Sequence, residues 1–162
     1  FQRSLATSCK YNSDHLEKLK NMYVHGPISK RINDHIVEFN VENEYPHAIV
    51  KMESRHELMH TGGSMHGAAY FKLLDDAAWF TAQAIVEDNF IFTTSFNTYI
   101  TRPVLTGTKL IASGKITNAT KSLIVAESSI LEEETGKLVA TGSGTFMRSH
   151  VPLNGVPSYS LP

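Results

Sequence analysis

The chain has 162 residues, of which 41% are hydrophobic and 19% are charged, a composition typical of one ordinary globular domain. Fifteen Lys and Arg residues against sixteen Asp and Glu residues give a formal net charge of -1, which excludes a broad electrostatic attraction to nucleic acid or to an anionic membrane. A single cysteine, Cys9, excludes an intramolecular disulfide, and no apolar run is long enough to span a bilayer, so we expect a cytoplasmic protein without a membrane span.

The first predicted element is a helix over residues 15–24, where apolar residues recur at helical spacing behind Asp14, a candidate N-cap. Residues 1–12 lack acidic side chains and are expected to form an irregular arm or the remnant of a targeting sequence. Gly26 and Pro27 end the helix. Two short strands are then predicted, over residues 36–41 and 48–52.

A long segment over residues 66–86 is the most distinctive stretch, because it is apolar nearly all round. A helix of that kind belongs inside a protein rather than on its surface. Gly62 and Gly63 break the backbone before it, and Ser64 is a candidate cap. The few polar side chains in the segment fall close to one stripe: Lys72, Asp75, Asp76 and Gln83.

After residue 89 the hydrophobic pattern changes to a period of two, which is typical of strands. Turn residues interrupt the pattern three times, and such short links favour an antiparallel meander. The predicted strands cover residues 92–101, 109–117, 123–131 and 138–146. The sequence therefore predicts an α+β fold in which a curled antiparallel sheet is wrapped around one long central helix.

Asp75 is the first candidate functional residue. A carboxylate inside an apolar helix costs several kcal/mol of desolvation unless it is paired or solvated. An ion pair of Lys72 with Asp75 or Asp76 on one wet edge of the helix would account for Asp76. It accounts less well for two adjacent acids that point about 100° apart. The spacing alone leaves function and structure equally open for Asp75.

The start of the central helix is the second candidate site. Glycines here let a ligand approach the backbone, and the first N–H groups of a helix lack internal partners. Such groups can stabilise an oxyanion or a polarised carbonyl. An ordinary N-terminal turn looks similar, so this pattern alone is not decisive.

The segment from Gly63 to Ala77, GSMHGAAYFKLLDDA, resembles the signature of PaaI-like hotdog thioesterases, G-x-x-H-G-G-x-x-x-x-L-x-D-x-A in outline. Arg102-Pro103 and residues 135–142 resemble later parts of the same family. The resemblance implies a hotdog domain over residues 30–148. Residues 1–29 would then be an arm with a short helix, and residues 149–162 an irregular tail.

By this resemblance, Asp75 would be the nucleophile or general base, and the Gly67 N–H would polarise the thioester carbonyl. His66 would shape the helix start, and Thr93 or Thr94 would hold water or the carboxylate. The substrate-binding residues implied are Gly63, Thr94, Arg102, Thr120, Lys121 and Ser122, the last four at the coenzyme A phosphates. Arg102 and Lys121 are equally typical of solvated strand ends.

Two positions depart from the family pattern. Ala68 replaces the second glycine after the histidine, a mild change at a helical position. His60 stands where the family usually has an asparagine. A histidine can donate a hydrogen bond to a carbonyl or orient water, and it adds a group that titrates near neutral pH.

A competing motif overlaps the same stretch. His56, Glu57, His60, Gly63 and His66 spell H-E-x-x-H-x-x-G-x-x-H, the zinc signature of metzincin proteases. A capping box from Ser54 to Glu57 favours a short helix there. We rank this zinc hydrolase second, because the hotdog pattern already accounts for the glycine and the last histidine and only 55 residues precede the motif. We therefore expect no metal.

The sequence thus predicts an enzyme that hydrolyses acyl-CoA thioesters, with coenzyme A as part of the substrate and no separate cofactor. A non-catalytic acyl-binding module on the same fold remains an alternative. The family resemblance implies a homodimer or a dimer of dimers with active sites between subunits, and no nucleic-acid partner. Candidate residues for an acyl pocket are Tyr70, Phe71, Trp79, Phe92 and Phe96.

Overall fold

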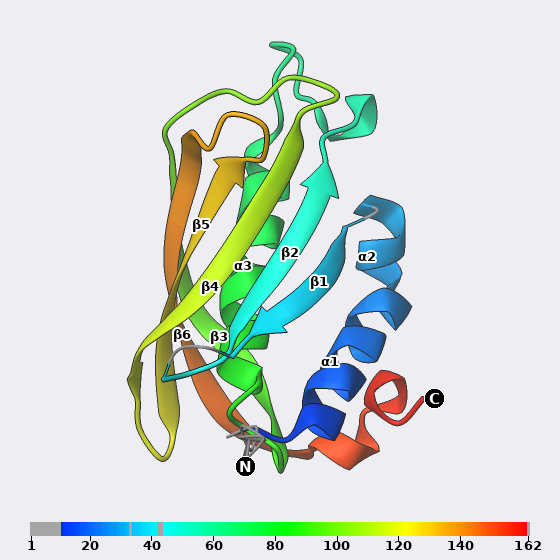
Figure 1. Cartoon of the computed structure of the whole chain (residues 1–162), viewed down its shortest axis with the longest axis vertical. Helices are drawn as coiled ribbons and strands as arrows, with labels where there is room; N and C mark the ends of the chain where they lie inside the picture. Colours follow the sequence, from blue (N-terminus) through cyan, green and yellow to red (C-terminus); the bar gives the residue numbers. More distant parts are fainter. Residues whose placement is uncertain (1–10, 33, 42–43, 162) are drawn as a thin grey trace, which may run out of the picture.

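The computed structural model describes residues 11–32, 34–41 and 44–161. Six strands form one antiparallel sheet in the order β1-β2-β4-β5-β6-β3, which curls around the helix α3 (Gly67–Gln83) (Figure 1). The strands are β1 (His35–Asn40), β2 (His47–Glu53), β3 (Asn89–Ile100), β4 (Lys109–Ala119), β5 (Leu123–Glu132) and β6 (Leu138–Pro152). The predicted sheet wrapped around one central helix is confirmed.

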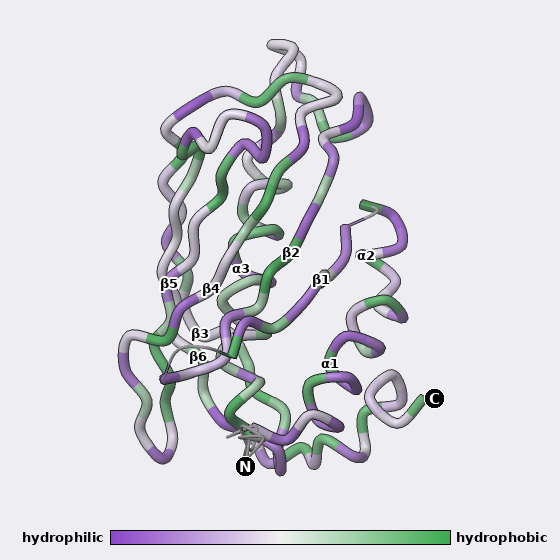
Figure 2. The backbone as a smooth tube through the Cα atoms, in the orientation of Figure 1, coloured by the Kyte–Doolittle hydropathy of each residue, from purple (hydrophilic) through white to green (hydrophobic). Residues whose placement is uncertain are grey.

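The helix α3 lies against the inner face of the sheet because nearly every side of it is apolar. Leu73, Leu74 and Ala77 are fully buried. On the sheet, hydrophobic and hydrophilic residues alternate along β2 and β4, so one face packs on α3 and the other faces outward (Figure 2). Gly114 of β4 lets the helix approach closely, since a Cβ there would overlap the carbonyl oxygen of Ala77.

The N-terminal helix α1 (Ser13–His25) begins two residues earlier than the sequence indicated. Its N-cap is Asn12, whose side chain accepts hydrogen bonds from the N–H groups of Asp14 and His15. The prediction of Asp14 as the cap is therefore wrong. Asp14 lies in the first turn instead, where its carboxylate pairs with Lys18 at 2.7 Å.

A second short helix, α2 (Pro27–Ile32), follows α1 and was not predicted. Pro27 does end α1, as expected, but it also occupies the first position of α2. Proline is well suited to that position, because it needs no N–H partner there. The sequence predicted only the helix-ending role of Pro27.

The helix α1 and the segment after β6 pack on the same core as α3. The His15 ring bridges the Tyr159 hydroxyl (2.8 Å) and the Gln83 carbonyl oxygen (3.0 Å). After β6, two short 3-10 helices, Leu153–Gly155 and Pro157–Tyr159, bury Leu153 and Tyr159. Among the helices of the described residues, none has the length and apolar character needed to cross a membrane.

Candidate functional site

Asp75 lies half-buried on the side of α3 that faces the start of β3. The Thr93 hydroxyl donates a hydrogen bond to Asp75 Oδ1 at 3.1 Å. Burial raises the pKa of Asp75 to about 6, although the Thr93 hydrogen bond opposes that shift, and the neighbouring Asp76 charge adds to it. A carboxylate with such a pKa can accept a proton near neutral pH.

Asp76 points to a different partner, as expected for a side chain about 100° further round the helix. Its Oδ2 accepts hydrogen bonds from Lys72 Nζ and from the Tyr23 hydroxyl, the latter at 2.7 Å. Lys72 Nζ also donates to Asp34 Oδ2 at 2.6 Å and to the Tyr23 hydroxyl at 3.2 Å. We call Tyr23, Asp34, Lys72 and Asp76 the anchor cluster.

The anchor cluster is buried, which the sequence did not indicate. The side chain of Asp34 is fully buried and that of Lys72 is 9% exposed. The expected pairing of Lys72 with Asp76 is present, but it lies inside the protein rather than on a wet edge. Asp34 was missed because it lies 38 residues before Lys72, in a polar stretch that resembles an ordinary loop. One of its oxygens, Oδ1, has no hydrogen-bond partner among the described residues.

A cavity of about 430 Å³ opens beside Asp75 and Thr93. Most of its wall is apolar or aromatic. The wall comes from α1, α2, α3, the start of β3 and the C-terminal tail. Its large side chains are Met22, Tyr23, Ile28, Trp79, Phe80, Phe90, Ile91, Phe92 and Val156.

The start of α3 is formed as the sequence suggested, except for its cap. His66, not Ser64, is the N-cap, and its Nδ1 accepts the Ala68 N–H at 3.0 Å. Gly67 is the first helical residue. Its N–H makes no hydrogen bond to any described residue, so it can bind a ligand oxygen.

His60 is held within the turn that precedes α3. Its Nδ1 accepts the Gly62 N–H at 2.9 Å, and its Nε2 lies 2.9 Å from the Ser64 hydroxyl. With Nδ1 accepting, the ring proton is on Nε2 and donates to Ser64. Both nitrogens are therefore engaged in shaping the turn in this structure.

A second, smaller hollow of about 330 Å³ lies at this end of α3 and is lined by Gly67, His60 and Arg102. Asp75 is absent from it. Gly67 and Asp75 are eight residues apart, which is about 12 Å along a helix at 1.5 Å per residue. The structure thus brings the predicted site residues together in two groups, one at each hollow.

The other predicted substrate-binding residues are more scattered. Gly63 has a positive φ of 82° in the turn before α3, which explains the glycine there. Thr94 points away from Asp75, and its hydroxyl bonds to the carbonyl and hydroxyl oxygens of Thr145. Thr120, Lys121 and Ser122 form the exposed turn between β4 and β5, at the end of the molecule opposite the start of α3 (Figure 1).

The predicted acyl-pocket residues divide in the same way. Trp79 and Phe92 line the cavity beside Asp75. Tyr70 lies in the hollow at Gly67, where its hydroxyl donates to the Arg102 carbonyl oxygen at 3.0 Å. Phe71 and Phe96 line neither hollow and pack against each other edge to face, with ring centroids 5.6 Å apart.

The stretch that resembles a zinc motif does not form a ligand set. Residues His56–Leu58 make one turn of 3-10 helix, whose start has no side-chain cap. The capping box is wrong, because the Ser54 hydroxyl instead binds the Leu105 carbonyl oxygen on the neighbouring loop. Within residues 11–32, 34–41 and 44–161, no three His, Cys, Asp or Glu side chains form a group that could hold a metal ion.

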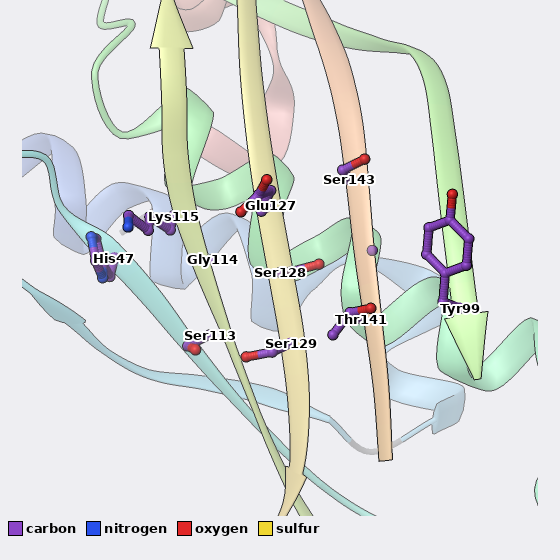
Figure 3. A pocket seen from close by; sticks show the side chains of 11 residues that line it. His47, Tyr99, Ser113, Gly114, Lys115, Glu127, Ser128, Ser129, Thr141 and Ser143 are labelled. Carbon is purple, nitrogen blue, oxygen red and sulfur yellow. The ribbon is translucent and has the colours of Figure 1, made fainter. Parts of the chain in front are cut away.

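A further hollow, of about 530 Å³, lies on the outer face of the sheet, away from α3 (Figure 3). It is lined by short polar side chains, with charged residues at one side. None of the predicted catalytic residues lies in it. The labelled side chains include His47, Ser113, Lys115, Glu127, Ser129, Thr141 and Ser143.

Comparison with known proteins relates the central part of the chain to a family. Residues 62–139 match the family model described as thioesterase superfamily. The PaaI protein of Escherichia coli, from its phenylacetic acid degradation operon, is 20% identical with a TM-score of 0.72, and the match covers 85% of this chain and 98% of that one. A thioesterase from Haemophilus influenzae is 22% identical with a TM-score of 0.71, over 83% and 90% of the two chains.

Zebrafish thioesterase superfamily member 2 is 15% identical with a TM-score of 0.69, over 83% of this chain and 95% of that one. No curated protein matches the chain by sequence. The fold is the hotdog fold of these thioesterases, as the resemblance in the sequence implied.

Proposed function

We propose that the protein hydrolyses acyl-CoA thioesters to a free acid and coenzyme A, with Asp75 as the catalytic carboxylate, because residues 62–139 match the thioesterase superfamily model. The observation that carries the proposal is the position of Asp75. It is partly withdrawn from water, it is held by Thr93, and it faces a cavity with an apolar wall. An acyl group suits such a wall, while the carboxylate meets the reacting carbonyl.

Asp75 can act in two ways. As a general base it accepts a proton from a water molecule, whose oxygen then bonds to the thioester carbon. As a nucleophile it forms an acyl-Asp75 anhydride, which water hydrolyses in a second step. In both routes the carbon–sulfur bond breaks, and the thiolate of coenzyme A leaves and takes up a proton. The raised pKa of Asp75 favours the first role, because a base works best when its pKa lies near the working pH.

The Gly67 N–H is proposed to stabilise the oxyanion that develops on the thioester oxygen. Gly67 is open to solvent at the start of α3, where the helix dipole also favours negative charge. It is too far along the same helix from Asp75 for one carbonyl to touch both. We therefore infer that a complete site combines Gly67 of one copy with Asp75 of a second copy.

The edge of the sheet supplies a surface for this pairing. β3 is the last strand in the sheet order, so one side of its backbone has no strand beside it among the described residues. Unpaired strand edges readily pair with another chain. Three large side chains of β3, Phe92, Tyr99 and Ile100, are exposed. A homodimer or a dimer of dimers that joins β3 edges would cover them.

The proposed coenzyme A contacts also depend on a second copy. Arg102 lies beside Gly67, whereas Lys121 lies at the opposite end of the sheet (Figure 1). Antiparallel pairing of two β3 edges brings opposite ends of two copies together. Arg102 of one copy and Lys121 of the other, with Thr120 and Ser122, could then contact the phosphates of one coenzyme A.

The proposed activity is tested by thiol release from a panel of acyl-CoAs. Asp75→Asn is nearly isosteric and should lower kcat on the order of 10²–10⁴-fold with the fold intact. Asp76→Asn should lower kcat far less, since Asp76 belongs to the anchor cluster. Equal losses in the two variants, or wild-type turnover in Asp75→Asn, would refute the assignment. A parallel assay with a chelator should show no change, and chelator-sensitive peptidase activity without thiol release would favour a zinc hydrolase.

The inter-subunit site is tested by mixing two inactive variants. Gly67→Pro removes the proposed donor N–H, and it suits the fold because proline is accepted at the first position of a helix. In a mixed dimer with Asp75→Asn, one of the two sites has an intact Gly67 and an intact Asp75, so activity should partly return. Subunit exchange is verified first with labelled chains. If verified mixed dimers stay inactive, the site lies within one chain or Gly67 is not a donor.

A further inference from the structure

The wall of the cavity beside Asp75 comes in large part from outside the segment shared with the thioesterase superfamily. That segment covers residues 62–139 and supplies α3 and β3. Met22 and Tyr23 of α1, Ile28 of α2 and Val156 of the tail complete the wall. The terminal elements therefore decide the shape of the cavity on the side opposite α3.

Rigid aromatic rings form one continuous row along this wall. Neighbouring ring centroids are 5.0 Å apart for Tyr23 and Phe80, 4.7 Å for Phe80 and Trp79, 5.0 Å for Trp79 and Phe90, and 5.2 Å for Phe90 and Phe92. Three of these contacts are edge to face and the Trp79–Phe90 contact is tilted by 48°. Such contacts are favourable at these distances, so the rings hold one another in place. A row of this kind presents a large apolar surface. Its rings have little freedom to move inward around a small ligand.

The anchor cluster fixes α1 and α2 against this row. Tyr23 binds Asp76 directly, and Lys72 ties Asp34, just after α2, to α3. The other end of α1 is held as well, because the His15 ring binds the Gln83 carbonyl oxygen at the end of α3. α1 is thus attached to α3 near both of its ends. These contacts hold α1 beside the cavity.

We propose that α1 and α2 form the acyl-selecting wall of the site, and that the cavity takes an apolar acyl group of medium size. The proposal rests on the proposed thioesterase function for its reacting groups. An apolar cavity of about 150 Å³ holds one benzene molecule. The cavity of about 430 Å³ is almost three times that volume, which leaves room for an acyl group of about eight to twelve carbons. Acetyl groups leave most of the wall unfilled.

Ile28 at the mouth of the cavity offers the clearest test. It lines the cavity, yet its side chain is 58% exposed, so replacing it leaves the core intact. Ile28→Gln removes apolar contact without adding charge. Val24→Gln is the matched control, because Val24 is 54% exposed on α1 and does not line the cavity.

Trp79 provides a direct signal, since it is the chain's single tryptophan and lies in the cavity wall. The full chain is titrated with 1-decanol, a neutral apolar probe, and tryptophan fluorescence is recorded. A saturable change is expected for the wild type, with a Kd about three- to tenfold higher in Ile28→Gln. The Kd of Val24→Gln should equal that of the wild type. No saturable change, or equal Kd values in the two variants, overturns the proposed wall.

Kinetics then separate this inference from the function on which it rests. Thiol release from decanoyl-CoA and acetyl-CoA gives a ratio of kcat/KM values, which should favour decanoyl-CoA and fall in Ile28→Gln but not in Val24→Gln. If the ratio is the same in all three proteins, the wall does not select the acyl group. If the wild type releases no thiol from any acyl-CoA while decanol still distinguishes the two variants, the proposed function fails and the apolar binding wall stands.

Discussion

Lys72→Met should be among the most destabilising single changes in α3, because it leaves two buried carboxylates without their shared cation. Lys72 Nζ donates to both Asp34 and Asp76. Removing one partner of a buried ion pair costs about 3–5 kcal/mol, mainly because an unpaired charge stays buried. Asp76 keeps the hydrogen bond from Tyr23 and is 19% exposed, so most of the loss should come from the fully buried Asp34.

The assay is thermal unfolding followed by circular dichroism and by Trp79 fluorescence. For a chain of this length, a loss of about 3–5 kcal/mol corresponds to a fall in Tm of about 6–20 °C. Lys18→Met is the control, because Lys18 forms an exposed pair with Asp14 and a long cation–π contact with the Tyr159 ring (5.8 Å), so its loss should change Tm far less. The double variant Lys72→Met/Asp34→Asn should recover at least half of the lost stability, since it removes the unpaired buried charge of Asp34.

The pH dependence of stability provides a second test of the Lys72→Met change. Burial raises the pKa of Asp76, and the Lys72 ammonium works against that shift. Without the ammonium, the folded-state pKa of Asp76 rises further above its unfolded value, so the folded variant binds more protons than the unfolded chain. The stability of Lys72→Met should therefore increase as pH falls toward the unfolded pKa of about 3.9. A Tm shift no larger than that of Lys18→Met would refute the reasoning.

Three further outcomes are expected. Catalysis by the Asp75 carboxylate should decline below a pH of about 6, and Thr93→Val should move this decline to higher pH in kcat/KM profiles, because the Thr93 hydrogen bond lowers the pKa of Asp75. His60→Asn should retain substantial thiol release, because both ring nitrogens of His60 bond within the turn before α3, whereas bound zinc lost from this variant would indicate a metal role. Gly114→Ala should lower the free energy of unfolding by about 1–3 kcal/mol or more, because its Cβ would overlap the backbone of α3, while Gly155→Ala, which meets open space, should not.

The elements of the fold were largely predictable, because each carries its own hydrophobic period. The all-apolar segment became α3, and the period-two stretches became strands with ends shifted by a few residues. The short α2 was not predicted because six residues are too few to show a helical period. The order of the strands, with β3 at an edge, depends on contacts between distant segments and cannot be read from local patterns.

The candidate site was predictable only where one short segment holds its residues. The sequence singled out Asp75 as an acid inside an apolar helix, and the family resemblance offered Thr93 or Thr94 as a hydroxyl partner. In the structure Thr93 makes this hydrogen bond. Tyr23 and Asp34 were not singled out, although both are close to Asp76. Tyr23 occupies an ordinary apolar position of α1, and Asp34 lies in a polar stretch, so neither departs from its local pattern. Only the packing of α1 on α3 brings them together.

The two adjacent acids show how one turn of α3 serves two purposes. Asp76 points toward α1 and is neutralised by Lys72, so it holds the terminal helices in place. Asp75 points toward β3, where it meets a hydroxyl and the open cavity instead of a cation. Lys72 lowers the pKa of Asp75 and the Asp76 charge raises it, so the anchor pair leaves burial as the dominant influence. The Lys72–Asp76 pair can therefore tie α1 to α3 while the pKa of Asp75 stays raised, as the proposed role of Asp75 as a base requires.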